Sequence, residues 1–155
     1  MSRASSALPD RIVQRMDCSS GAAAVEFALL MPMLLLMLIG IFVFGIAISN
    51  YIVVTGSAQA AGLQLSISRG TTAPWTDTLN QVYASAAALT RTNLTVTLSV
   101  NGVACASDAA CKILLSSNAG QAASATVTYS CSLLVLGRDY APSCRLHSTA
   151  TGRIQ

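Results

Sequence analysis

Apolar residues are concentrated in one long run near the start of the chain. From Phe27 to Ile48 no residue is charged and almost none is polar. At about 1.5 Å of rise per residue, a helix of this length crosses a bilayer core of about 30 Å. The pattern therefore predicts a membrane-spanning helix over about residues 27–48.

A single carboxylate, Glu26, lies at the entrance to this run. An unpaired charge moved toward hydrocarbon costs a few kcal/mol or more, so a simple anchor gains nothing from it. The position of Glu26 favours a paired charge. The alternative is a carboxylate at the membrane interface with no role beyond topology.

Beyond Ile48 the helix is predicted to continue without charge to about Ser68. Apolar residues recur there at spacings of three and four and form one stripe, a second stripe lies on the far side, and polar residues run between them. Two apolar faces indicate two neighbours, the protein's own domain and adjacent chains; a stalk packed only on its own domain is the alternative. Ala58 and Gly62 are small enough for close helix approach. The first stripe is Tyr51, Val54, Ala58, Ala61 and Leu65, the second is Ile52, Leu63 and Ile67, and the polar seam is Asn50, Ser57 and Gln64.

The rest of the pattern predicts a small α+β domain over residues 69–155. Arg69-Gly70 ends the long helix, and Pro74 opens a second helix that reaches about Thr90. Trp75 is expected to anchor the core or an interface. The buried face of this helix is predicted to comprise Leu79, Val82, Tyr83, Ala86 and Leu89.

Strict alternation over residues 94–100 predicts a strand, and Asn101-Gly102 predicts a turn after it. A second strand is predicted over residues 125–136, with Val127, Tyr129 and Cys131 on one face, and a shorter third strand near residues 146–151. Together these form an antiparallel sheet of two to four strands. The second helix and the end of the first are expected to back it.

Composition fits one membrane span plus one small domain, because 53% of the residues are hydrophobic and only 10% are charged. The basic residues are scattered singly, so nucleic-acid binding has no support. Arg3, Arg11 and Arg15 precede the span, whereas the next basic residue is Arg69. This asymmetry predicts a cytoplasmic N-terminus and a C-terminal domain on the other side of the membrane.

Of the five cysteines, Cys18 precedes the span and four follow it. An even number on one side of the span predicts two disulfides in an oxidising compartment. Three pairings are possible, and local closure favours Cys105 with Cys111 and Cys131 with Cys144. The alternative, a zinc site, lacks a C-x2-C pair.

No catalytic chemistry is predicted. His147 is the single histidine, and no acid or nucleophile stands at a useful spacing from it. The sequence contains no phosphate-binding loop, dinucleotide fingerprint or metal-ligand cluster. We therefore expect no enzyme activity, no cofactor and no metal.

The residues before the span have the form of a leader. Residues 1–20 are polar, and Ser19, Ser20 and Gly21 are expected to be flexible and accessible. Gly21, four small or apolar residues, and then Glu26-Phe27 resemble the processing site of type IV pilins, in the short-leader form of Tad/Flp pilus proteins. The following run, with Pro32, Gly40 and Phe44-Gly45, resembles the TadE-like minor pilins, or pseudopilins. Members often carry an acid and a base where this chain has Val43 and Ile46.

This resemblance implies that a prepilin peptidase cuts between Gly21 and Ala22. The chain would then divide into a leader (1–21), a long helix (22–68) and a periplasmic domain (69–155). Cleavage gives Ala22 a new ammonium, which would pair with Glu26 of a neighbouring subunit and set their register. Phe27 belongs to the same recognition stretch.

The resemblance also implies partners and location. The partners are the major Flp pilin, other minor pilins and the inner-membrane pilus assembly platform, and the location is the bacterial inner membrane. It leaves open whether the protein stays there as an assembly factor or enters the extracellular fibre, where a role in cell adhesion is also implied. Two alternatives are an uncleaved single-pass protein whose periplasmic domain binds a partner, and a domain secreted after cleavage at Ala58-Gln59-Ala60.

Overall fold

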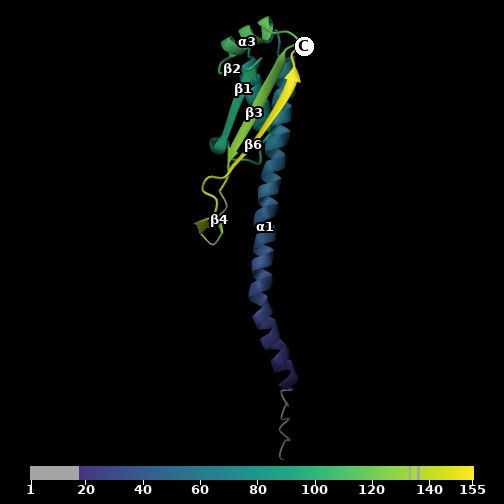
Figure 1. Ribbon diagram of the computed structural model, residues 1–155, viewed down its shortest axis with the longest axis vertical. Helices are drawn as coiled ribbons and strands as arrows, with labels where there is room; N and C mark the ends of the chain where they lie inside the picture. The colour runs from purple at the N-terminus through teal and green to yellow at the C-terminus, as the bar shows by residue number, and fades with distance from the viewer. Residues whose placement is uncertain (1–17, 133, 136) are drawn as a thin grey trace, which may run out of the picture. The chain divides into compact units, whose positions relative to one another are not determined.

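The computed structural model describes residues 18–132, 134–135 and 137–155 (Figure 1). Most of the predicted leader, including Arg3, Arg11 and Arg15, lies outside the described residues. The chain divides into two units, up to Gly40 and from Ile41 onward. The helix α1 (Cys18–Ile67) runs through this division.

In the first unit α1 is apolar on all sides. Leu29 and Met33 are each 75% exposed, and the helix continues through Pro32. Ser19, Ser20 and Gly21 are helical. The expectation of a flexible stretch there was wrong, because the alanines after Gly21 favour helix and extend it backwards.

One helix among the described residues is long and apolar enough to cross a membrane. It covers Gly21–Ile67, and its most apolar window has a mean hydropathy of 2.8. This agrees with membrane anchoring through the N-terminal helix.

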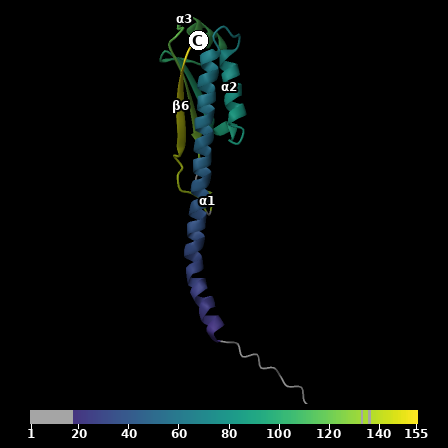
Figure 2. The same cartoon turned by 90° about the vertical axis from the view of Figure 1, so that its right-hand side faces the viewer.

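The second unit adds an α+β domain to the end of α1, which confirms the predicted fold class. A four-stranded antiparallel sheet has the order β2-β1-β3-β6, and β4 pairs with β5 in a separate hairpin. Figures 1 and 2 show these elements. In chain order they are α2 (Pro74–Ser85), the 3-10 helix η1 (Arg91–Asn93), β1 (Leu94–Val100), β2 (Val103–Cys105), α3 (Asp108–Ser117), β3 (Ala122–Ser130), β4 (Leu134–Val135), β5 (Arg138–Asp139) and β6 (Arg145–Arg153).

The core lies between one face of the sheet and the helices α1 and α2 (Figure 2). Leu65 of α1, Val82 of α2, Leu98 of β1 and Val127 of β3 are fully buried. The opposite face of the sheet carries mainly Thr and Ser, because side chains alternate between faces along each strand. Across it, the Thr126 and Thr149 hydroxyls form a hydrogen bond of 2.8 Å.

The first strand and its turn follow the prediction. β1 covers residues 94–100, and Asn101 (φ 50°) and Gly102 (φ 80°) form a two-residue hairpin loop to β2. Two central residues with positive φ are typical of the type I′ turn that Asn-Gly favours. β2 itself was not predicted, since three residues carry too little pattern.

The other two strands differ from prediction at their ends. β3 begins at Ala122 and ends at Ser130, earlier than the predicted 125–136. The chain leaves the sheet at Cys131, which bonds to Cys144, and two residues of the predicted strand, Leu133 and Leu136, lie outside the described residues. β6 is longer than predicted, because all nine of its residues pair with β3.

The helices differ as well. α2 starts at Pro74, as predicted, but ends at Ser85 rather than near Thr90. A turn after Ala86 brings Leu89 into the core with 6% exposure before β1 begins. Residues 108–117, for which no element was predicted from the sequence, form α3; its N-cap is Ser107, whose hydroxyl accepts a hydrogen bond from the Ala110 N–H.

Candidate processing and assembly site

The predicted processing residues all lie on one exposed stretch of α1. Gly21, Ala22, Glu26 and Phe27 are exposed, Phe27 to 63%. Ala22 and Glu26 are four residues apart and therefore lie on the same helix face, one turn from each other. No atom lies within 4 Å of the position that a Cβ would take on Gly21. A side chain at Gly21 would therefore meet nothing in the described chain.

Glu26 is the single charged residue from Cys18 to Ser68. Fifteen large apolar side chains between Phe27 and Ile48 are 42–75% exposed. A helix that is apolar on every side is stable only where lipid or other protein surrounds it. The exposed apolar residues of this stretch are Phe27, Leu29, Leu30, Met31, Met33, Leu34, Leu35, Leu36, Met37, Leu38, Ile41, Phe42, Phe44, Ile46 and Ile48.

The two predicted stripes on the later part of α1 have different surroundings. Val54, Ala58, Ala61 and Leu65 are fully buried against the domain, while Tyr51, grouped with them by spacing, is 51% exposed. The second stripe is open: Ile52, Leu63 and Ile67 are 57–67% exposed. One apolar face therefore packs on the domain, and none of the described residues covers the other.

The three residues of the predicted polar seam, Asn50, Ser57 and Gln64, are not all on the surface. Ser57 is fully buried, and its hydroxyl donates a 2.9 Å hydrogen bond to the Val54 carbonyl one turn earlier. Asn50 and Gln64 are partly exposed. Because the Ser57 hydroxyl is satisfied within its own helix, it can face the core without an unpaired polar atom.

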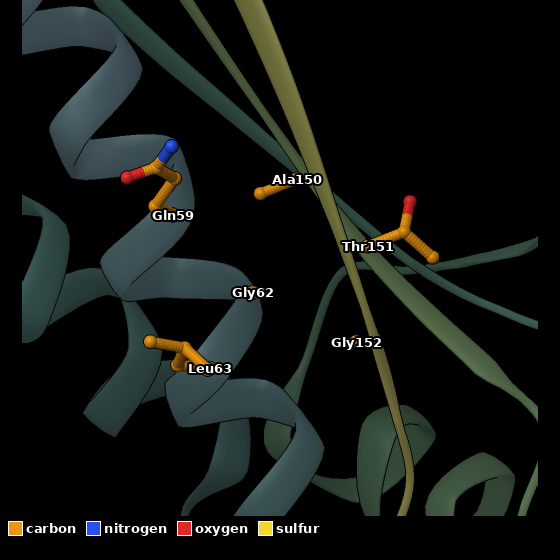
Figure 3. Close-up of a pocket in the computed structure, with 6 residues that line it drawn as sticks. All are labelled: Gln59, Gly62, Leu63, Ala150, Thr151 and Gly152. Atoms are coloured by element: carbon orange, nitrogen blue, oxygen red, sulfur yellow. The ribbon is translucent and has the colours of Figure 1, made fainter.

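Gly62 allows α1 to approach β6 closely. A Cβ on Gly62 would lie 3.1 Å from Ala150 Cβ and 3.2 Å from the Ala150 carbonyl oxygen, and one on Gly152 would lie 3.0 Å from Ser66 Cβ. Figure 3 shows Gly62 and Ala150 across this contact. Gly62 was expected to allow close approach of a helix, and this was wrong because it meets a strand, β6; Ala58 is fully buried in the domain.

Residues 21–62 match the family model described as TadE-like protein. The match begins at the glycine of the predicted processing site and ends at the glycine that packs on β6. It confirms the resemblance inferred from Gly21, Glu26-Phe27 and the following apolar run. The match associates the chain with Tad pili and with a structural rather than a catalytic family. The comparisons with curated proteins and with solved structures found no match.

The secretory alternative requires cleavage after Ala60, near the end of the TadE-like segment. This bond lies inside α1, and Ala58 and Ala61 on either side of it are fully buried. A domain that begins at Ala61 would lack the fully buried Val54 and Ala58 and with them part of its core, which disfavours this alternative.

Outside the TadE-like segment the four domain cysteines form two disulfides. Cys105 bonds to Cys111 and Cys131 to Cys144, each with a Cα–Cα distance of 5.1 Å. This is the pairing that local closure favours. The first bridge joins β2 to α3, and the second closes the loop that contains the β4-β5 hairpin. Two bridges of this kind are consistent with an oxidising compartment.

A polar contact that the sequence did not reveal joins the starts of α2 and α3. The Thr76 N–H donates to Asp108 Oδ1 at 2.9 Å, and the Thr76 hydroxyl donates to Oδ2 at 2.6 Å. These two hydrogen bonds hold the pKa of Asp108 below its usual range, and the bond from the Thr76 hydroxyl has the larger effect. The contact spans 32 residues, so only the fold brings the partners together.

His147 lies exposed on β6, opposite Thr128 of β3. Among the described residues no group of three or more His, Cys, Asp and Glu side chains could hold a metal ion. Trp75 packs partly buried against the core, in agreement with an anchoring role.

Proposed function

We propose that this protein is a pilin-like subunit, a minor pilin or pseudopilin, for assembly of a Tad/Flp-type pilus. The observation that carries the proposal is the Gly21 to Phe27 motif at the start of a TadE-like helix whose large apolar side chains are mostly exposed as far as Ile48. A helix of this kind suits residence in the membrane followed by transfer into a bundle of like helices.

In this proposal a prepilin peptidase cuts after Gly21. The new ammonium at Ala22 lies one turn from Glu26 on the same helix face. In a bundle of parallel helices, the ammonium of one subunit pairs with Glu26 of the next, which removes the cost of a lone charge in an apolar surrounding. Because the pair forms only at one axial offset, it sets the register between subunits.

The domain after the helix supports a minor rather than a bulk component. A bulk fibre subunit needs little more than the helix, whereas this chain adds a four-stranded sheet and two short helices. The subunit would prime, cap or connect the fibre. Its domain would lie in the periplasm, where the two disulfides are maintained, and its leader in the cytoplasm.

The decisive experiment is intact mass with N-terminal sequencing of the protein from its native membrane fraction, without reduction. We expect a chain that begins at Ala22 and is lighter by four hydrogens, two for each disulfide. A chain that begins at Met1 or Ser2 would contradict processing and favour an uncleaved membrane protein with a periplasmic binding domain. A start at Ala61 would indicate a secreted domain.

Matched glycine variants separate recognition from folding. Gly21 and Gly40 both lie in α1 with no atom within 4 Å of an added Cβ. We expect Gly21→Val to abolish cleavage and Gly40→Val to leave it intact. Glu26→Gln should still be cleaved but should lose co-purification with other pilins, since it removes only the carboxylate charge. Cleavage of Gly21→Val at the wild-type rate would refute the proposed site.

A further inference from the structure

The two edges of the four-stranded sheet differ. The edge strand β2 has three residues, is followed closely by α3 and is tied to it by the Cys105–Cys111 disulfide. The opposite edge strand, β6, has nine residues, and all of them pair with β3 in an uninterrupted register. Within the described residues β6 has no strand on its other side. The longest row of backbone donors and acceptors without a strand partner in this sheet is therefore on the β6 side.

β6 lacks the features that usually prevent strand addition. Its sequence, RLHSTATGR, contains no proline and no lysine, and its continuous register with β3 leaves no bulge. Between the terminal arginines the residues are small, hydroxylated or apolar, apart from His147. Such an edge is a ready template for an extended chain.

A groove lies beside this edge. It has a volume of about 240 Å³, and Figure 3 shows its lining residues on α1 and on β6. Leu63, 67% exposed, gives it an apolar wall, and Gly62 and Gly152, which form the close contact between α1 and β6, also line it. An added strand could insert a side chain here. The lining residues are Gln59, Gly62, Leu63, Ala150, Thr151 and Gly152.

The charges at the ends of β6 indicate what kind of segment could pair with this strand. Arg145 and Arg153 stand exposed at the two ends of β6, and β1, β2, β3 and β6 contain no Asp or Glu. If β6 paired with itself in antiparallel full register, Arg145 would face Arg153 of the second copy at both ends. Like charges directly opposite each other are destabilising. The edge therefore disfavours a second copy and favours a segment with acidic ends.

We propose that the free edge of β6 binds an extended segment of another protein as a fifth strand. The segment carries acidic residues about nine positions apart, which reach Arg145 and Arg153, and an apolar side chain between them that enters the groove. Backbone hydrogen bonds supply affinity, and the charges and the groove select the partner. This proposal does not rest on processing at Gly21.

The test uses the full-length protein in lipid nanodiscs and fluorescent nine-residue peptides of alternating Thr and Val. One peptide has Glu at both ends, the second has Lys, and the third is the Glu peptide with alternate backbone nitrogens methylated. Fluorescence anisotropy measures binding. We expect the Glu peptide to bind about tenfold or more tightly than the Lys peptide. The methylated peptide should not bind, because it cannot donate to β6.

Charge reversal provides the second arm. Arg145→Glu with Arg153→Glu should reverse the preference, so that the Lys peptide binds more tightly, while far-UV circular dichroism stays unchanged because both arginines are exposed. Lys112→Glu, on the exposed surface of α3, is the matched control and should keep the Glu preference. Equal binding of the Glu and Lys peptides, or undiminished binding of the methylated peptide, would overturn the proposal. So would self-association through β6 that excludes the peptides.

Discussion

Two stretches of α1 are rich in apolar residues but are covered in different ways. From Phe27 to Ile48 most of the large side chains are exposed, and only Ile39 and Val43 are partly buried. From Val54 to Leu65 one face is fully buried against the sheet, while Leu63 on the other face is 67% exposed. The later stretch has a cover within its own chain, and the earlier stretch depends on lipid or other subunits for its cover.

This difference separates two kinds of apolar residue that composition alone does not distinguish. A buried residue of the later stretch contributes to the stability of the domain. A residue of the earlier stretch contributes to partition into the membrane and to contacts with other chains. Substitutions in the two stretches should therefore change different measurements. Trp75, the one tryptophan, packs against the core and reports unfolding of the domain by fluorescence.

The largest effect is expected from Leu65→Ala. Leu65 is fully buried, so the change leaves a cavity and should lower the free energy of unfolding by about 2–5 kcal/mol. Urea unfolding followed by Trp75 fluorescence measures it. Leu36→Ala, at a position 68% exposed, should change this value by less than about 0.5 kcal/mol. Equal effects at the two positions would contradict the comparison.

A charge in the middle of the earlier stretch should change membrane insertion rather than the stability of the domain. Leu36→Lys should cost about 3 kcal/mol of membrane insertion, because the ammonium would lie near the bilayer centre. The measurement is the fraction of protein that resists alkaline extraction from membranes. Leu63→Lys lies on the exposed face beside the domain and should remain in the membrane fraction. If the Leu63→Lys variant were also extracted from the membrane by alkali, the span would extend further along α1.

A bulkier residue at Gly62 should disturb the close contact with β6. Gly62→Val should cost about 1–3 kcal/mol of domain stability, because its Cβ meets the Ala150 backbone, which cannot easily move. Gly56→Val lies in the same helix with no atom within 4 Å of its Cβ and is the control. The Trp75 unfolding midpoint should fall only for Gly62→Val. A similar fall for both would contradict the Ala150 contact as the cause, because valine is a better helix former than glycine.

The smallest effect concerns acid. Hydrogen bonds from Thr76 hold the pKa of Asp108 below its unfolded value. Their contribution is therefore complete above the unfolded pKa and is lost as the pH falls through the folded pKa. Asp108→Asn should make the unfolding midpoint less sensitive to acidification below about pH 4. Thr76→Val should do so in part, because the backbone donor remains; a steeper acid dependence in either variant would refute this assignment.

Local pattern was sufficient where one rule decided the structure. Asn101-Gly102 predicted its hairpin because few residues other than glycine and asparagine adopt positive φ easily. Spacing predicted the buried stripe from Val54 to Leu65, and short separations favoured the observed disulfides. Each of these features depends on residues close together in the sequence.

Features that depend on distant residues were missed. Gly62 looked suited to a neighbouring helix, but its partner is Ala150, which only the sheet topology brings near. The Thr76–Asp108 contact likewise joins two helix starts that pattern alone does not relate. α3 left a local signal, since Ser107 is a good N-cap and Cys111 and Leu115 are four residues apart, but its ten residues are short for a periodic pattern.

The position of the disulfides has a mechanical consequence. Both close short loops, with sequence separations of 6 and 13, and neither joins α1 to the sheet. Tension applied along α1 would therefore be resisted by noncovalent packing alone, chiefly that of Val54, Ala58, Ala61 and Leu65. Once this packing is broken, the stretched chain extends along its whole length except for the residues inside the two loops that the disulfides close. A reducing agent should then lengthen the stretched domain slightly without changing the force at which it first opens.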